Sequence, residues 1–174
     1  MTERTFATVI AVLLVILTAA SRVMPHPWNL TPMIAVALFA GARIARWQLA
    51  GLAVIGCLAL GDLLLGTFAY SGFYWVYGAF LAVVAIGRVV RARTGVLAPV
   101  IAALGAGFVF FAVTNLAVFA GDLYPHSWAG LVADFTAALP FYRNQVVGDV
   151  AFTAALFGVH AAATSLYARR TATA

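Results

Sequence analysis

The sequence contains no lysine, a single glutamate and a single cysteine, and charged residues make up only 9% of its 174 positions. Hydrophobic residues make up 65%, a balance far from that of a soluble globular domain. One cysteine excludes an intramolecular disulfide. The formal net charge of +5 comes from arginine, which in so apolar a chain reports membrane orientation and not nucleic-acid binding. The composition therefore predicts an integral membrane protein surrounded by lipid, with no nucleic-acid partner.

Enzyme signatures are also missing. The chain has no HExxH, Walker loop, GxSxG or haem-attachment motif, and its three histidines are not spaced as a metal cluster on one helix. We therefore expect no catalytic residue, no enzyme activity and no intrinsic cofactor. A membrane-embedded enzyme that uses Asp62 and Asp149 as acid and base stays an alternative.

Apolar segments separated by turn residues or arginines predict six helices. They cover about residues 6–20, 31–42, 48–65, 72–86, 97–119 and 145–167. The first could be a signal peptide cleaved near Ala20, but its apolar run extends to Met24, so we assign it as a helix. The second is short for a full crossing, and Pro32 suits its first turn. With no linker in the chain, we predict one all-α domain over residues 1–174, a bundle of six transmembrane helices.

The connection between the fifth and sixth helices, residues 120–144, is neither disordered nor strongly polar. Its centre, SWAGLVADFTAAL (residues 127–139), predicts a short amphipathic or re-entrant helix that Pro140 ends. We expect this short helix to lie over one mouth of the bundle as a lid.

Arginine near span ends is retained on the cytoplasmic side of a membrane. With the amino terminus inside, eight arginines lie in cytoplasmic segments and two outside. The inner ones are Arg4, Arg43, Arg46, Arg88, Arg91, Arg93, Arg169 and Arg170, and the outer ones are Arg22 and Arg143. This bias predicts a multi-pass protein of the cell (inner) membrane with both termini cytoplasmic.

All four aspartates then fall in the outer half, with Asp62 near the outer end of the third helix and Asp149 near the outer start of the sixth. A charged side chain within a span costs about 2.5 to 3.5 kcal/mol on insertion scales, so it normally faces a cavity or a partner. We predict a polar chamber that opens to the outside. Alternatively, or within that chamber, Asp62 and Asp149 form structural ion pairs with Arg22 and Arg143.

Side chains around this chamber are predicted to bind a small molecule, with polar groups for its hydrogen bonds and aromatic rings for its apolar faces. The predicted substrate-binding residues are His26, Asn29, Asp62, Tyr74, Trp75, Tyr77, Asn115, Arg143, Asn144 and Asp149. A simpler alternative for the aromatic run at residues 73–77 is an ordinary interfacial belt. Cys57 fits a small core residue.

Ala7 and Ala11 are spaced four apart in the first helix, a pattern that lets another helix approach closely. We expect this face to dock another membrane subunit, with packing inside its own bundle as the alternative.

Two stretches carry a resemblance to a known family. LTPMIAVALFAGARI (residues 30–44) and LAGLAVIGCLALGDLLLG (residues 49–66) are similar to the substrate-binding S components of energy-coupling-factor vitamin transporters. His26 in a proline-rich turn, Asp62 after glycine, the aromatics at residues 74–77 and LPFYRNQVVGD (residues 139–149) resemble the solitary cobalamin-specific S components. The resemblance covers most of the chain.

This resemblance implies a substrate-binding membrane subunit for uptake of a vitamin or vitamin-like micronutrient, such as cobalamin or a related corrinoid. The pocket would face outward, and the whole bundle would reorient in the membrane during transport. Its partners would be a transmembrane coupling subunit and two ATPases, unless it acts alone. A structural or assembly subunit without a ligand is the alternative.

One feature departs from the cobalamin-specific pattern. That family has a cysteine that approaches the cobalt near the outer start of the fourth helix, where this chain reads TFAYSGFYWVY (residues 67–77). Cys57 lies nearer the middle of a span and is not assigned that role. We expect His26 to coordinate the cobalt of a bound corrinoid through its imidazole instead.

Overall fold

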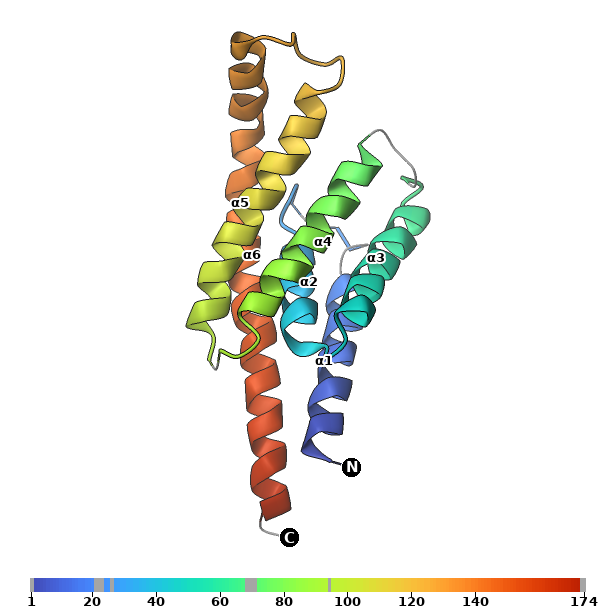
Figure 1. Ribbon diagram of the computed structural model, residues 1–174, viewed down its shortest axis with the longest axis vertical. Helices are drawn as coiled ribbons and strands as arrows, with labels where there is room; N and C mark the ends of the chain where they lie inside the picture. Colours follow the sequence, from blue (N-terminus) through green and yellow to red (C-terminus); the bar gives the residue numbers. More distant parts are fainter. Residues whose placement is uncertain (1, 21–23, 26, 68–71, 94, 173–174) are drawn as a thin grey trace.

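The computed structural model describes residues 2–20, 24–25, 27–67, 72–93 and 95–172. Within these ranges the chain forms six helices and no strand (Figure 1). The helices are α1 (Glu3–Ala20), α2 (Met33–Arg43), α3 (Trp47–Leu64), α4 (Phe73–Val89), α5 (Leu97–Phe119) and α6 (Trp128–Ala172). The predicted all-α class and the predicted number of helices are confirmed.

The sixth helix differs most from its prediction. α6 begins at Trp128 rather than near residue 145, has 45 residues, and contains Pro140 in its interior. The separate lid predicted for residues 127–139 is therefore wrong, because this stretch is the first part of α6.

Packing against α5 explains why the proline does not end the helix. Phe111 of α5 contacts Phe135 before the proline and Tyr142 after it, with ring centroids 5.6 and 4.4 Å apart. An interior proline costs roughly 3 kcal/mol of helix stability. Aromatic contacts on both sides of Pro140 oppose this cost, and tertiary packing thus overrides the local signal.

By length and hydropathy, three helices in the described part of the chain can cross a membrane, namely α3, α5 and α6. This indicates a membrane protein but corrects the prediction of six full spans. α2 has 11 residues, and at 1.5 Å per residue it rises roughly 16 Å, about half of a ~30 Å hydrocarbon core. The apolar stretches of α1 and α4 are also shorter than a span needs.

α2 forms the centre of the bundle. Every residue from Met33 to Ala42 is buried, and α2 contacts all five other helices. A helix that is apolar on all sides can be accommodated only in such a buried position or in lipid. In Figure 1, α2 lies at mid-height among the longer helices, while α6 runs the length of the molecule.

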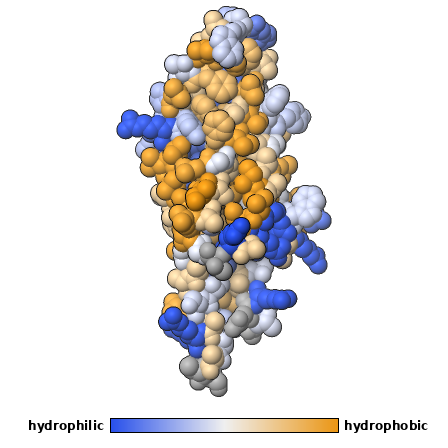
Figure 2. Space-filling model, turned by 60° about the vertical axis from the view of Figure 1, so that its left-hand side comes forward, coloured by the Kyte–Doolittle hydropathy of each residue, from blue (hydrophilic) through white to orange (hydrophobic). Residues whose placement is uncertain are grey.

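The bundle has two chemically different ends. We call the end where α2 and α4 finish the arginine end; it carries Arg43, Arg46, Arg88, Arg91 and Arg93. We call the end where α3 and α5 finish the aspartate end; it carries Asp62, Asp122 and Asp134. Both chain termini lie toward the arginine end, which is the lower one in Figure 1. Figure 2 shows apolar side chains over the middle of the visible face and a group of hydrophilic ones below them, with further hydrophilic side chains at the upper tip and the upper left edge.

At the arginine end, α2 and α4 touch backbone to backbone. A Cβ atom added at Gly41 would meet the carbonyl oxygen of Val84, and one added at Gly87 would meet that of Leu38. Only glycine at both positions permits this approach.

Arginine side chains bond to the backbone beside this contact. The Arg88 guanidinium donates to the carbonyl oxygens of Gly41 (3.2 Å), Ile44 (2.9 Å) and Ala45 (3.1 Å). The last carbonyls of a helix have no partner within it, so these bonds satisfy acceptors at and just after the end of α2. The Arg43 guanidinium bonds in turn to the carbonyl oxygens of Arg91 (3.1 Å) and Arg93 (3.4 Å).

Candidate functional site

Asp62 lies in the last turn of α3 at the aspartate end and is only 1% exposed. The Tyr77 hydroxyl of α4 donates to Asp62 Oδ2 at 2.8 Å, and the Thr67 hydroxyl donates to Oδ1 at 3.4 Å. A buried carboxylate needs such donors, because desolvation without them is costly. Tyr77 therefore holds Asp62 in a fixed position between α3 and α4.

A second buried polar group joins α5 to α6. The Gln145 side-chain amide donates to the carbonyl oxygen of Gly107 at 2.9 Å and to Asp149 Oδ2 at 3.2 Å. Gln145 and Asp149 are four residues apart and so share one face of α6. A Cβ atom at Gly107 would collide with Asp149 Oδ2, so the glycine makes room for the carboxylate.

The other oxygen of Asp149 is less well satisfied. Among the described residues, neither Asp149 Oδ1 nor Thr153 Oγ1 has a hydrogen-bond partner, and both atoms are buried. Thr153 lies one turn further along α6, so α6 carries a buried polar stripe that leads inward from Gln145.

Between these two groups lie cavities that share walls. One of about 150 Å³ is lined by Asp62, Asn29 and Gln145 with apolar neighbours such as Phe110. A second, of about 180 Å³, is also lined by Asn29, Phe110 and Gln145, together with Asn115.

A third cavity, of about 320 Å³, lies between the start of α4 and the end of α5 and includes Asp122. It shares Val76 with the first cavity and Thr114 with the second. We call these three cavities together the chamber. Its walls come from the segment before α2 and from α3, α4, α5 and α6.

The segment that precedes α2 covers the chamber. The Asn144 side-chain amide donates to the carbonyl oxygen of Trp28 at 3.0 Å, and the Trp28 ring stacks on Phe141 with centroids 5.6 Å apart. Asn29 follows with φ of 58°, a left-handed conformation that asparagine tolerates better than most residues. This turn places Asn29 in the walls of two cavities, so the cover predicted for residues 127–139 is supplied by residues 27–32.

The structure brings several predicted site residues together. Asn29, Asp62 and Asn115 line the chamber, and Tyr77 bonds to Asp62. Asn144 fixes the covering turn, and Asp149 lies one helical turn beyond Gln145 and is not among the residues that line the chamber.

Other predicted site residues lie elsewhere. Tyr74 is 85% exposed, Trp75 is 50% exposed, and Arg143 is also exposed; none of the three lines the chamber. His26, the predicted cobalt ligand, lies outside the described residues, as does Arg22. The hydrogen-bond donor to Asp149 is Gln145, so the structure gives no support to an Asp149–Arg143 ion pair.

Several chamber residues were not predicted, among them Gln145, Thr114 and Phe110. Gln145 was recognisable, because a polar residue four positions before Asp149 lies on the same helical face. Nothing in the sequence singles out Phe110 from the other phenylalanines of its helix.

The small face of α1 points into the bundle. Ala11 is completely buried, and the carbonyl oxygen of Ala7 lies 3.2 Å from His160 Nε2 of α6. This arrangement matches packing within the bundle, the alternative to docking of another subunit. No group of three or more metal-ligating side chains occurs within the described ranges.

The sequence model of the protein family DUF6580, a family of unknown function, matches residues 2–172. Because the match covers nearly the whole sequence, the protein belongs to this family. No curated protein and no solved structure matches the chain.

Proposed function

We propose that the protein is the substrate-binding membrane subunit of an uptake system for a small vitamin-like solute, and that the solute binds in the chamber. The observation that carries this proposal is the convergence of Asn29, Asp62, Asn115 and Gln145, from four separate segments, on cavities that share walls. Few convergent polar groups in a mainly apolar cavity are typical of small-molecule sites.

The arginine distribution supports an outward-facing chamber. Eight arginines lie toward the arginine end and the termini, and the positive-inside rule places that side in the cytoplasm. We propose that α1 and α4 cross the membrane as short spans and that α2 occupies half of its thickness. The aspartate end then faces the outside, where a nutrient arrives.

Cavity size bears on the choice of solute. Sites for drug-sized ligands usually measure about 300 to 1,000 Å³, and of the three chamber cavities that of 320 Å³ reaches this range by itself, while those of 150 and 180 Å³ do not. A corrinoid is larger than such ligands, so cobalamin requires the covering turn at residues 27–32 to move away. A smaller vitamin fits with less rearrangement. Coordination of cobalt by His26 belongs to the corrinoid case alone.

Release of the solute inside needs a second conformation. The resemblance to S components implies that the whole bundle reorients in the membrane, either together with a transmembrane coupling subunit and ATPases or alone. Among the described residues, the side chains of Asp62 and Gln145 bond to other side chains or to one carbonyl, and a solute with donors and acceptors could replace these bonds.

The experiment is ligand identification followed by a matched pair of variants. Detergent-purified protein is analysed by mass spectrometry for co-purified molecules and by thermal shift with a panel of water-soluble vitamins that includes cobalamin. Thr114→Phe fills two of the cavities, whereas Leu116→Phe enlarges an exposed residue of the same helix. We expect Thr114→Phe to weaken binding by at least about tenfold, or about 1.4 kcal/mol, and Leu116→Phe to leave it unchanged.

Three outcomes would contradict the proposal. A folded protein that retains no small molecule and is stabilised by no vitamin would favour a structural subunit. Equal binding by the Thr114→Phe and wild-type proteins would place the ligand outside the chamber. Turnover of a bound molecule that is lost in Asp62→Asn would favour the enzyme alternative.

A further inference from the structure

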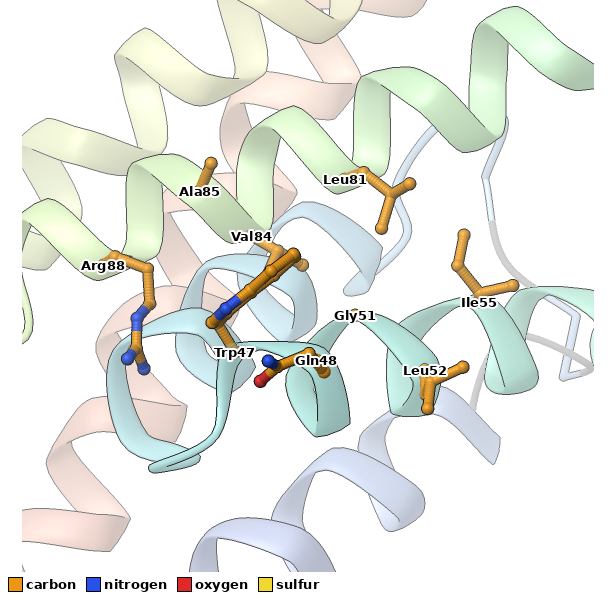
Figure 3. Close-up of a pocket in the computed structure, with 9 residues that line it drawn as sticks. All are labelled: Trp47, Gln48, Gly51, Leu52, Ile55, Leu81, Val84, Ala85 and Arg88. Atoms are coloured by element: carbon orange, nitrogen blue, oxygen red, sulfur yellow. The ribbon is translucent and has the colours of Figure 1, made fainter.

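One large cavity lies outside the chamber. It is a groove of about 790 Å³ between α3 and α4, toward the arginine end (Figure 3). Its walls are apolar side chains, including Leu52 and Ile55 of α3 and Leu81 and Ala85 of α4. Leu52 is 67% and Leu81 46% exposed, so the groove lies on the outer surface of the bundle.

A glycine creates the hollow. Gly51 lines the groove, and the nearest atom to a Cβ added there would be Leu81 Cδ2 at 3.4 Å. A side chain longer than alanine at position 51 would therefore extend into the space between the helices.

The polar side chains of the groove are gathered at one end. Figure 3 shows Trp47 and Gln48 at the start of α3 and Arg88 across from them on α4, while the other labelled side chains are apolar. Trp47 is 62% exposed. Tryptophan at such a position is typical of the level of lipid headgroups.

This end of the groove is basic without acidic compensation. Arg46 is exposed and directly precedes Trp47, and Arg91 lies one turn beyond Arg88, with its guanidinium 3.3 Å from the carbonyl oxygen of Ala45. Between Glu3 and Asp62, and again between Asp62 and Asp122, the sequence contains no acidic residue.

We propose that this groove binds an anionic phospholipid, with one acyl chain between α3 and α4 and the phosphate group near Arg46, Arg88 and Arg91. The apolar walls match the chain, and the uncompensated arginines match the charge of the headgroup. Basic pockets between membrane helices on the cytoplasmic side bind anionic headgroups in this way. The groove and the chamber lie at opposite ends of α3 and α4, so this proposal does not rest on the proposed function.

Trp47 provides a direct readout. The other tryptophans, Trp28, Trp75 and Trp128, are exposed and are replaced by phenylalanine. The resulting protein is placed in phosphatidylcholine vesicles that contain a small fraction of phosphatidylglycerol with brominated acyl chains, or the same fraction of brominated phosphatidylcholine. Because an arginine near the surface favours an anionic lipid by roughly fivefold, we expect much stronger quenching of Trp47 by the brominated phosphatidylglycerol.

Charge and shape are then tested separately. Arg46→Gln should reduce the preference for phosphatidylglycerol by roughly fivefold, and high salt should reduce it in the unsubstituted protein. Ala85→Phe fills the groove, whereas Ala82→Phe adds the same ring at an exposed alanine of α4 that does not line it. We expect Ala85→Phe to abolish the preference and Ala82→Phe to retain it.

Equal quenching by the two lipids, in protein whose helical circular dichroism is unchanged, would overturn the proposal. So would a preference that persists in Ala85→Phe, since the lipid would then bind elsewhere. Cross-linking of a partner helix to position 85, together with equal quenching by the two lipids, would assign the groove to a protein instead.

Discussion

The two ends of the bundle use opposite means to handle polar groups in an apolar setting. At the arginine end, the guanidinium groups of Arg43 and Arg88 bond to backbone carbonyls, and two glycines close the space between α2 and α4. At the aspartate end, the contacts seen among the described residues join Asp62 to the Tyr77 and Thr67 hydroxyls and Gln145 to one carbonyl and to Asp149, and cavities lie between these groups.

The two ends therefore differ in how easily their polar contacts can change. A backbone carbonyl can leave an arginine only if the main chain moves, whereas a tyrosine hydroxyl or a side-chain amide can rotate to another partner. The arginine end is therefore suited to hold the bundle together, while the side-chain contacts at the aspartate end can rearrange more easily, as the proposed binding of a solute requires.

The largest expected effect comes from removing the glycine contact. Gly41→Ala places a methyl group against the carbonyl oxygen of Val84 and should cost more than about 3 kcal/mol, because backbone atoms cannot move aside cheaply. Thermal unfolding in detergent, followed by circular dichroism, measures the loss. Gly56→Ala is the control, since a Cβ there has no neighbour within 4 Å. An unchanged unfolding temperature for Gly41→Ala would contradict the close contact of α2 and α4.

The next effect tests the carbonyl bonds themselves. Arg88→Met leaves three carbonyl oxygens without this donor and should lower the free energy of unfolding by about 2 to 3 kcal/mol. The same unfolding assay applies. Arg88→Lys should recover only part of the loss, because an ammonium group does not present the planar fork of a guanidinium. Full recovery by lysine would mean that charge alone matters here.

At the aspartate end the expected cost is smaller. Tyr77→Phe removes the 2.8 Å bond to Asp62 and should cost about 1 to 2 kcal/mol. Tyr74→Phe, at an 85% exposed position one turn away, should change stability little. In a double-mutant cycle, Asp62→Asn and Tyr77→Phe should be non-additive, because the residues are in contact. Additive effects would show that the pair does not couple α3 to α4.

The smallest effect is expected at Arg143, which lies away from the arginine end. Arg143 is exposed, so Arg143→Ala should change the free energy of unfolding by less than about 0.5 kcal/mol. Binding of the ligand by the same variant is measured with the thermal-shift assay described above. A large loss of stability would support the predicted ion pair between Arg143 and an aspartate. A loss of ligand binding without a loss of stability would support a role of Arg143 in the binding site.

The sequence predicted the helices well where apolar runs have clear ends. The helix at residues 97–119 was predicted with the bounds that the structure has, because arginines and Gly95 precede it and polar residues follow. α6 was misread because Pro140 and the polar run after it look like a helix boundary. Only the contacts of Phe111 with both parts of α6 reveal its continuity, and no local pattern encodes them.

The candidate site was predictable in part for a related reason. Polar residues are so few in the apolar segments that Asn29, Asp62 and Asn115 stood out, and all three line cavities. Tyr74 and Tyr77 were both predicted to bind the substrate, and residues three apart share a helix face. The structure separates them, since Tyr77 is buried against Asp62 while Tyr74 lies in the first turn, where little packs against it.

The central position of α2 has a consequence for biosynthesis. Because α2 is too short to cross a bilayer alone and has no side that suits water, it should enter the membrane as a hairpin with α3, which follows it after only three residues. α6 covers part of α2 yet follows every other helix in the sequence. Until α6 emerges from the ribosome, one flank of the core helix stays open to lipid, and nascent chains that stop before α6 should be the ones that quality-control proteases recognise.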